Sequence, residues 1–281
     1  MLYEPTMHKL YAMKLNGMAG AYEEQLQQSQ MGDLTFEDRF TMLVERQWIW
    51  KENRALIRRL KYAGLKLDAC IEDIDYRHPR GLKRSTIEQL AACDWVKYHR
   101  NCIITGPTGA GKTFIGCALA HQACREGHRA LYFYVPKLFR ELTIAHADGR
   151  ITKLLKKIAK SPVLIIDDWG LANLKRYQYR DFLEILDDRH GTGSTVITSQ
   201  FPISSWHDLI GDPTVADAIL DRLVHNAYKI ELNGDSMRKK KKRRGKNMNA
   251  AEEIKLEKKE KNRHPDPSDQ GSDNSKSGGK A

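Results

Sequence analysis

Hydrophobic residues recur at helical spacing through roughly the first 100 residues of the chain, and no strand pattern interrupts them. The spacing predicts one helix over residues 6–29 and a longer helix over residues 36–62. In the longer helix, Phe36, Phe40 and Val44 fall on one face. The first part of the chain is therefore expected to be an all-helical domain.

End signals support the longer helix. Thr35 precedes it as a suitable N-cap, and Gly64 follows it at the position where glycine commonly ends a helix. A third helix is predicted after Ser85, with Ile87 and Trp95 on one side.

The pattern changes near residue 101, where short β-prone runs begin to alternate with helical stretches. These runs lie at residues 102–105, 130–134, 163–166, 195–198 and 227–230. Alternation of strands with helices predicts a mostly parallel sheet covered by helices, an α/β fold.

The chain therefore divides into a small helical N-terminal domain (residues 1–75), an α/β domain (76–237) and a tail (238–281). The tail lacks apolar periodicity and is predicted to be disordered. It contains 15 basic and 7 acidic residues, so it contributes most of the net charge of +11. A basic tail favours binding to a polyanion, although it could also serve only to keep the protein soluble.

Composition narrows the class of protein further. Hydrophobic residues make up 41% of the chain, but no run approaches the roughly 18 apolar residues of a membrane span. The N-terminus lacks the pattern of a signal peptide, and the five cysteines form no CxxC pair. We therefore expect a cytoplasmic protein without a membrane partner, a disulfide framework or a zinc site.

A complete GxxxxGK[ST] motif follows the first predicted strand and opens a predicted helix, as a phosphate-binding loop requires. Its residues are Gly106, Pro107, Thr108, Gly109, Ala110, Gly111, Lys112 and Thr113. The glycines allow backbone N–H groups to point at phosphate oxygens. Lys112 is predicted to bind the β- and γ-phosphates of ATP and Thr113 to bind Mg²⁺.

Two carboxylates end the apolar run at residues 163–166. Asp167 is predicted to hold Mg²⁺, and Asp168 to orient and deprotonate the water that attacks the γ-phosphate. A carboxylate after a core strand is more often a simple helix cap, but the phosphate loop about fifty residues earlier favours the functional interpretation.

Other polar residues sit where they could complete such a site. Gln200, and secondarily Ser199, follow the fourth predicted strand and could sense the γ-phosphate, or could simply begin a turn. Asp212 and Pro213 start a helix that ends near Arg222. Arg222 is either an arginine finger for a neighbouring subunit or an arginine favoured by the helix dipole.

Basic residues suggest contacts with DNA phosphates. The long helix carries Arg54, Arg58 and Lys61 on one stripe near Trp48 and Trp50. A solvated face over core tryptophans is the alternative. In the tail, the candidates are Lys239, Lys240 and Lys241 within a run of eight cations in nine residues.

Taken together, these motifs resemble those of AAA+ ATPases, and specifically the IstB-like ATP-binding helpers of insertion sequences, whose sister group is the DnaC-type helicase loaders. The resemblance covers about residues 5–240, and its segments are GPTGAGKT, LIIDDWG, VITSQFP, AILDRL and GDSMR. In the helical domain GMAGAYEEQ, LTFEDRFTMLVERQW and NRALIRRLKYAG also look like that family.

The resemblance implies a P-loop AAA+ ATPase that forms a homo-oligomer on double-stranded DNA and assists a transposase. By the same resemblance, Arg222 is the finger acting in trans and Arg238 a second sensor. Asp168 stands where the wider AAA+ pattern has Glu, so hydrolysis is expected to be slow. The alternatives are a helicase loader, a P-loop kinase for a small metabolite and a scaffold gated by nucleotide without useful hydrolysis.

Overall fold

The computed structural model describes residues 3–28, 33–171, 174–234 and 236–237. The predicted disordered tail (238–281) lies outside the described residues. Within the described part of the chain, no helix is both long and apolar enough to cross a membrane.

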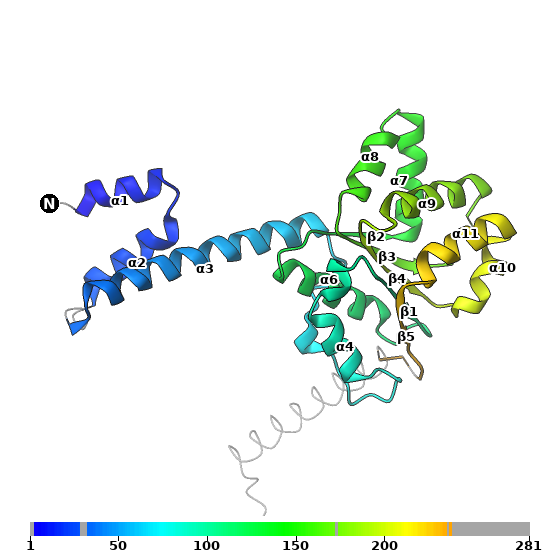
Figure 1. The fold of residues 1–281 in the computed structure, drawn as a ribbon, viewed down its shortest axis with the longest axis horizontal. Coiled ribbons are helices and arrows are strands. Elements are labelled where there is room, and N and C mark those ends of the chain that lie inside the picture. Colours follow the sequence, from blue (N-terminus) through cyan, green and yellow to red (C-terminus); the bar gives the residue numbers. More distant parts are fainter. Residues whose placement is uncertain (1–2, 29–32, 172–173, 235, 238–281) are drawn as a thin grey trace, which may run out of the picture. The chain divides into compact units, whose positions relative to one another are not determined.

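The α/β region contains one sheet whose five described strands all run parallel, in the order β2-β3-β4-β1-β5 (Figure 1). The strands are β1 (Asn101–Thr105), β2 (Ala130–Tyr134), β3 (Val163–Trp169), β4 (Ser194–Ser199) and β5 (Ala227–Glu231). Each contains one of the runs predicted from the sequence, which confirms the α/β fold class.

Helices cover both faces of this sheet (Figure 1). On one face lie α4 (Arg84–Ala91), the short α5 (Asp94–Lys97) and α6 (Lys112–Arg125). On the other lie α7 (Val135–Ala147), α8 (Ile151–Ala159), α9 (Arg176–Arg189), α10 (Trp206–Ile210) and α11 (Pro213–Val224). Two short 3₁₀ turns, η2 (Ile71–Asp73) and η3 (Ile203–Ser205), join elements at the edges.

Burial on both faces explains why the strands read as continuous apolar runs. In β3, Val163 and Ile165 pack into one core, whereas Leu164 and Ile166 pack into the other. The carboxyl ends of parallel strands share one edge, so the strands place Asp167 beside the loop that follows β1.

The N-terminal helices are α1 (Tyr3–Ala12), α2 (Asn16–Gln27) and α3 (Phe36–Ala63). The prediction of a single helix over residues 6–29 is wrong. The chain reverses at Lys14, whose φ is 59°, and the N–H of Leu15 donates to the Leu10 carbonyl to close α1.

Packing against α3 requires this reversal. In α2, a Cβ on Gly17 would lie 2.6 Å from the Cβ of Trp50, so the two helices cross closely there. The Met18 N–H also donates to the Gln47 side chain at 3.1 Å. Asn16 and Gly17 at the start of α2 form a dipeptide that commonly marks a turn, a signal that the prediction of one continuous helix did not use.

The ends of α3 match the prediction. The Thr35 hydroxyl accepts from the Asp38 N–H, and Gly64 adopts a left-handed conformation with φ of 60°. The predicted helix after Ser85 is shorter than expected, because Cys93, with φ of 60°, ends it before Trp95. Trp95 is buried on α5 instead.

Candidate functional site at the carboxyl edge of the sheet

The loop between β1 and α6 has the backbone geometry of a phosphate-binding site. Gly106, Gly109 and Gly111 all have positive φ, at 140°, 86° and 98°, which only glycine adopts without strain. A Cβ on Gly106 would lie 2.2 Å from the carbonyl oxygen of Leu232. The loop then opens directly into α6, whose N-terminal N–H groups favour an anion.

Lys112 begins α6 and folds back over this loop. Its Nζ donates to the Gly106 carbonyl at 2.7 Å and to the Pro107 carbonyl at 3.0 Å. The residue is only 5% exposed. These carbonyl bonds hold the ammonium group at the loop, where phosphate oxygens are able to replace them as partners.

Asp167 ends the apolar part of β3 and is completely buried. Its Oδ1 accepts from the hydroxyls of Thr113 and Thr198, both at 2.8 Å. Its Oδ2 accepts from the Tyr132 hydroxyl at 2.5 Å and from Lys66 Nζ at 3.2 Å. Burial, followed by the hydrogen bond to Asp167, raises the pKa of Tyr132, so this hydroxyl remains a donor.

The Thr113 hydroxyl and the Asp167 carboxylate are oxygen donors in direct contact beside the phosphate loop. Hard oxygen ligands of this kind suit Mg²⁺, which in nucleotide sites takes one or two carboxylates together with substrate phosphates. The donor set therefore fits the metal expected from the sequence.

Asp168 occupies a bulge in β3, where its pairing with β4 shifts register. Its φ is 64°, and its N–H donates to the Thr198 hydroxyl at 2.9 Å. Burial, and then the charge of Asp167, raise the pKa of Asp168. A carboxylate with a raised pKa is a stronger base once it is ionised.

Gln200 lies between the phosphate loop and Asp168. The Thr108 hydroxyl donates to Gln200 Oε1 at 2.6 Å, and the Gln200 side chain lies near enough to Asp168 to act on the pKa of that carboxyl. By contrast, Ser199 is fully buried and donates to the Trp169 carbonyl. Of the two candidates for sensing the γ-phosphate, Gln200 is the one positioned at the site.

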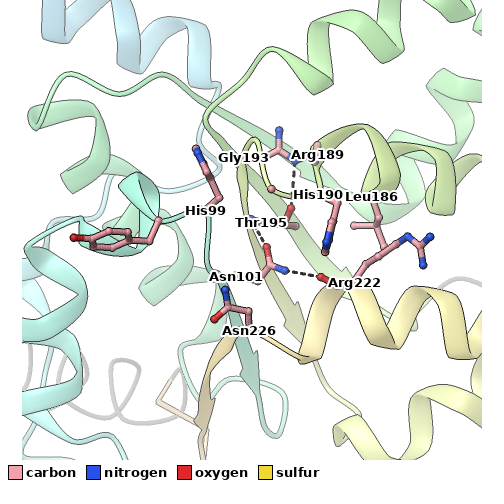
Figure 2. Close-up of a pocket in the computed structure, with 11 residues that line it drawn as sticks. His99, Asn101, Leu186, Arg189, His190, Gly193, Thr195, Arg222 and Asn226 are labelled. Carbon is pink, nitrogen blue, oxygen red and sulfur yellow. Dashed lines mark hydrogen bonds between the residues drawn. The ribbon is translucent and has the colours of Figure 1, made fainter.

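Arg222 lies at the opposite edge of the sheet. Figure 2 shows it at a cavity of about 240 Å³ formed where β1, β4 and β5 begin. The Asn101 side chain links β1 to β4 and to α11. It accepts from the Thr195 N–H and donates to the Arg222 carbonyl, both at 2.9 Å. With a rise of about 3.3 Å per residue, β1 alone separates this edge from the phosphate loop by roughly 13 Å.

The Arg222 guanidinium is held by an ion pair with Asp187 of α9 and by a bond to the Ala218 carbonyl at 2.9 Å. Nearby, buried Arg189 donates to the carbonyls of Ser161 and Ser194, both at 2.6 Å, which ties α9 to the strand ends. Arg222 is therefore held by these contacts at the edge of the sheet opposite the phosphate loop of its own chain.

The predicted stripe on α3 is exposed. Arg54, Arg58 and Lys61 all face solvent, and the Arg54 guanidinium lies 4.8 Å from the centre of the Trp50 ring. Trp48 is 64% exposed, so the alternative of core tryptophans is wrong for this residue. Arg238, Lys239, Lys240 and Lys241 lie outside the described residues.

A second basic surface was not recognised from the sequence. On α8, Leu155 and Ile158 face the core. The other face borders a groove lined by Lys153, Lys156, Lys157 and Lys160, together with Gly149 and Thr152. Lys157 Nζ lies 5.8 Å from the centre of the Tyr62 ring on α3, so the two basic surfaces adjoin. In a helix, the spacing of Lys153, Lys156 and Lys157 places all three on one side, so a helical assignment of this segment would have predicted the basic face.

The model of the IstB-like ATP-binding protein family matches residues 8–245 of the chain. The chain belongs to this family. The match spans the N-terminal helices, the phosphate loop, both carboxylates and Arg222, so the IstB-like assignment rests on nearly all of the described structure.

Relatives of this IstB-like protein are described as insertion sequence ATP-binding proteins. It is 46% identical to the insertion sequence ATP-binding protein y4pL of Sinorhizobium fredii, over 87% of this chain and all of the relative. It is 30% identical to the IS21 ATP-binding protein of Pseudomonas aeruginosa, over 85% of this chain and 91% of the relative. These matches establish an ATP-binding protein of the insertion-sequence type.

Among solved structures, DnaI is similar to this IstB-like chain, with 27% identity and a TM-score of 0.51. The similarity covers 59% of this chain and 91% of DnaI. This similarity supports the AAA+ fold of the α/β region.

Proposed function

We propose that this IstB-like protein is an ATPase that assembles as a homo-oligomer on double-stranded DNA and assists a transposase. The observation that carries the proposal is the separation of Arg222 from the nucleotide site. Residues for binding ATP lie at one edge of the sheet and Arg222 at the other. Head-to-tail contact between copies would bring Arg222 of one subunit to the nucleotide of the next.

The chemistry assigned to each residue follows from its position. Lys112 binds the β- and γ-phosphates, while Thr113 and Asp167 hold Mg²⁺, which neutralises charge that develops on the phosphates. Asp168 accepts the proton of the attacking water, and Gln200 orients that water or senses the γ-phosphate. The residues that contact Asp168 and the phosphate loop in the structure support these roles.

We assign DNA binding to the adjoining basic faces of α3 and α8, with the tail as an additional contact. Lysine and arginine neutralise phosphates without reading bases, so this binding would tolerate many sequences. We further propose residues 1–75 as the DNA- or partner-binding domain, 76–237 as the ATPase domain and Arg238 as a second sensor. The insertion-sequence context of the relatives supports a transposase partner in the bacterial cytoplasm.

Sedimentation with duplex DNA tests the proposal. With ATP and Mg²⁺ present, we expect large protein–DNA assemblies, because ATP bound between neighbouring subunits would stabilise the assembled form. Without nucleotide, we expect the protein to sediment mainly apart from the DNA. A monomer that is indifferent to both DNA and nucleotide would refute the proposal.

Neutralising the α8 lysines tests the DNA surface. We expect the triple variant Lys153→Gln, Lys156→Gln, Lys157→Gln to bind duplex DNA more weakly. The slope of log K against log salt should become shallower by about 0.9 for each DNA phosphate that the variant no longer neutralises. Fluorescence anisotropy across a salt series measures both quantities.

A matched control removes the same charge from exposed lysines elsewhere on the protein. Lys83→Gln, Lys97→Gln and Lys229→Gln together should leave the salt slope close to that of the wild type. Equal losses of affinity in the two triple variants would indicate that only net charge matters, and that α8 does not touch DNA.

A helicase loader is the second candidate, favoured by the similarity to DnaI. It predicts a preference for single-stranded DNA and capture by a replicative helicase. A P-loop kinase predicts phosphate transfer to a soluble acceptor by a monomer, which would leave Arg222 at the far edge without a nucleotide to contact.

A further inference from the structure

Lys66 reaches the nucleotide site from a part of the chain that the motifs do not include. It lies two residues after Gly64, the residue that ends α3. Its Nζ is 3.2 Å from Asp167 Oδ2 and 4.0 Å from Asp168 Oδ2. It also lies 4.9 Å from the centre of the Tyr134 ring.

The Asp167 carboxylate is saturated in this arrangement. A carboxylate offers about four lone-pair positions. Among the described residues, Thr113, Thr198, Tyr132 and Lys66 donate to them, two on each oxygen. A divalent cation bound to Asp167, directly or through water, requires one of these donors to leave.

The donors differ in their freedom to move. Thr198 is completely buried, Tyr132 is fixed on β2, and Thr113 is itself a ligand in the proposed metal site. The Lys66 side chain is 43% exposed, and its ammonium group is carried on a flexible four-carbon stem. Lys66 is thus the donor that can retreat into water without breaking a strand or leaving a buried hydroxyl unpaired.

We propose that Lys66 is a resident counter-cation that occupies the metal face of Asp167 and is displaced when a divalent cation binds. The inference rests on the metal site assigned under the proposed function. Lys66 supplies one positive charge to two adjacent carboxylates, which stabilises the site before metal arrives. Because the same charge competes with the metal, Lys66 sets how tightly the metal binds.

Lys66 lies close to the C-terminal end of α3, so its distance from Asp167 depends on where that end is held. The end of α3 is anchored on α6, where Arg59 Nε donates to the Cys124 carbonyl at 2.7 Å, and Ala63 is buried. A shift of α3 at that anchor would move Lys66 relative to Asp167, because only Gly64 and Leu65 separate Lys66 from the last residue of the helix.

Binding of Mn²⁺ tests the proposal without measuring activity. Free Mn²⁺ is followed by electron paramagnetic resonance while it is titrated into the full-length protein saturated with ADP. For Lys66→Met, which removes the charge but keeps most of the side-chain length, we expect Mn²⁺ to bind about three- to tenfold more tightly than to the wild type. Lys66→Gln should shift the affinity in the same direction, whereas Lys66→Arg should keep it close to the wild-type value.

Lys83→Met is the matched control, because Lys83 is exposed and lies outside the site. It should bind Mn²⁺ as the wild type does. Unchanged or weaker Mn²⁺ binding in both Lys66→Met and Lys66→Gln, with wild-type binding intact, would overturn the role of Lys66 alone. Failure of the wild type to bind Mn²⁺ in the presence of ADP would overturn the metal site itself, and this inference with it.

Discussion

Replacing Arg222 with alanine is expected to lower the rate of ATP hydrolysis by about 10³–10⁵-fold, the range for arginine fingers supplied by a neighbouring subunit. ATP binding should remain, because Arg222 lies at the edge of the sheet opposite Lys112 and Thr113. Steady-state turnover and equilibrium binding of a fluorescent ATP analogue, both on assembled protein, measure the two effects separately.

Arg176→Ala is the matched control. Arg176 of α9 pairs with Asp212 at the start of α11, just as Arg222 of α11 pairs with Asp187 near the end of α9. Both substitutions remove an ion pair between the same two helices, but only Arg222 is assigned to a neighbouring nucleotide. Unchanged turnover in assembled Arg222→Ala protein would refute the assignment.

Mixing two inactive proteins separates action in trans from a general defect. Lys112→Ala subunits lack nucleotide binding but keep Arg222, while Arg222→Ala subunits keep nucleotide binding. In random mixed oligomers about a quarter of interfaces join an intact nucleotide site to an intact finger, so activity should return. Turnover that stays as low as in the separate variants would contradict the trans arrangement.

Asp168→Asn is expected to reduce hydrolysis by about 10²–10⁴-fold, the usual contribution of a general base, while ATP binding is retained. Asparagine tolerates the left-handed backbone at this position, where φ is 64°, so the loss reflects the missing charge rather than backbone strain. Single-turnover hydrolysis and nucleotide affinity check the two parts of this prediction.

The same substitution should stabilise the fold near neutral pH. Burial and the charge of Asp167 raise the pKa of Asp168 above its unfolded value, so the folded state favours the protonated form. The stability from this group is present at low pH and is lost as pH rises through the folded pKa. An amide avoids that loss, so thermal melting should show a higher Tm for Asp168→Asn at pH 7 than for the wild type.

Two outcomes would contradict this account of Asp168. Asp188 is exposed, so the control variant Asp188→Asn should change neither turnover nor Tm appreciably. Equal effects of Asp168→Asn and Asp188→Asn would show that only the loss of one negative charge matters. Wild-type turnover in Asp168→Asn would show that Asp168 is not the base.

The acid limb of the wild-type pH–rate profile should lie above the range of an ordinary aspartate, because the pKa of Asp168 is raised.

Local features of the chain were readable without the structure. The phosphate loop depends on glycines at positive φ within eight consecutive residues, so its geometry is encoded where the motif stands. A strand buried on both faces appears as a continuous apolar run, which made residues 163–166 of β3 and the Asp167 that follows them recognisable. The caps of α3 are likewise set by single residues at each end, Thr35 and Gly64.

Contacts between distant segments required the tertiary structure. Lys66 stands 101 residues before Asp167, and no spacing rule relates a lysine after a helix to a strand end in another region. Tyr132 meets Asp167 only because β2 pairs with β3, and Lys157 of α8 comes near Tyr62 of α3 only in the tertiary fold. The break at Lys14 similarly arises from the packing of α2 on α3, which overrides a local helical pattern. Local backbone chemistry thus determined the nucleotide loop, whereas strand order and helix packing determined which distant charges meet there and which edge of the sheet carries Arg222.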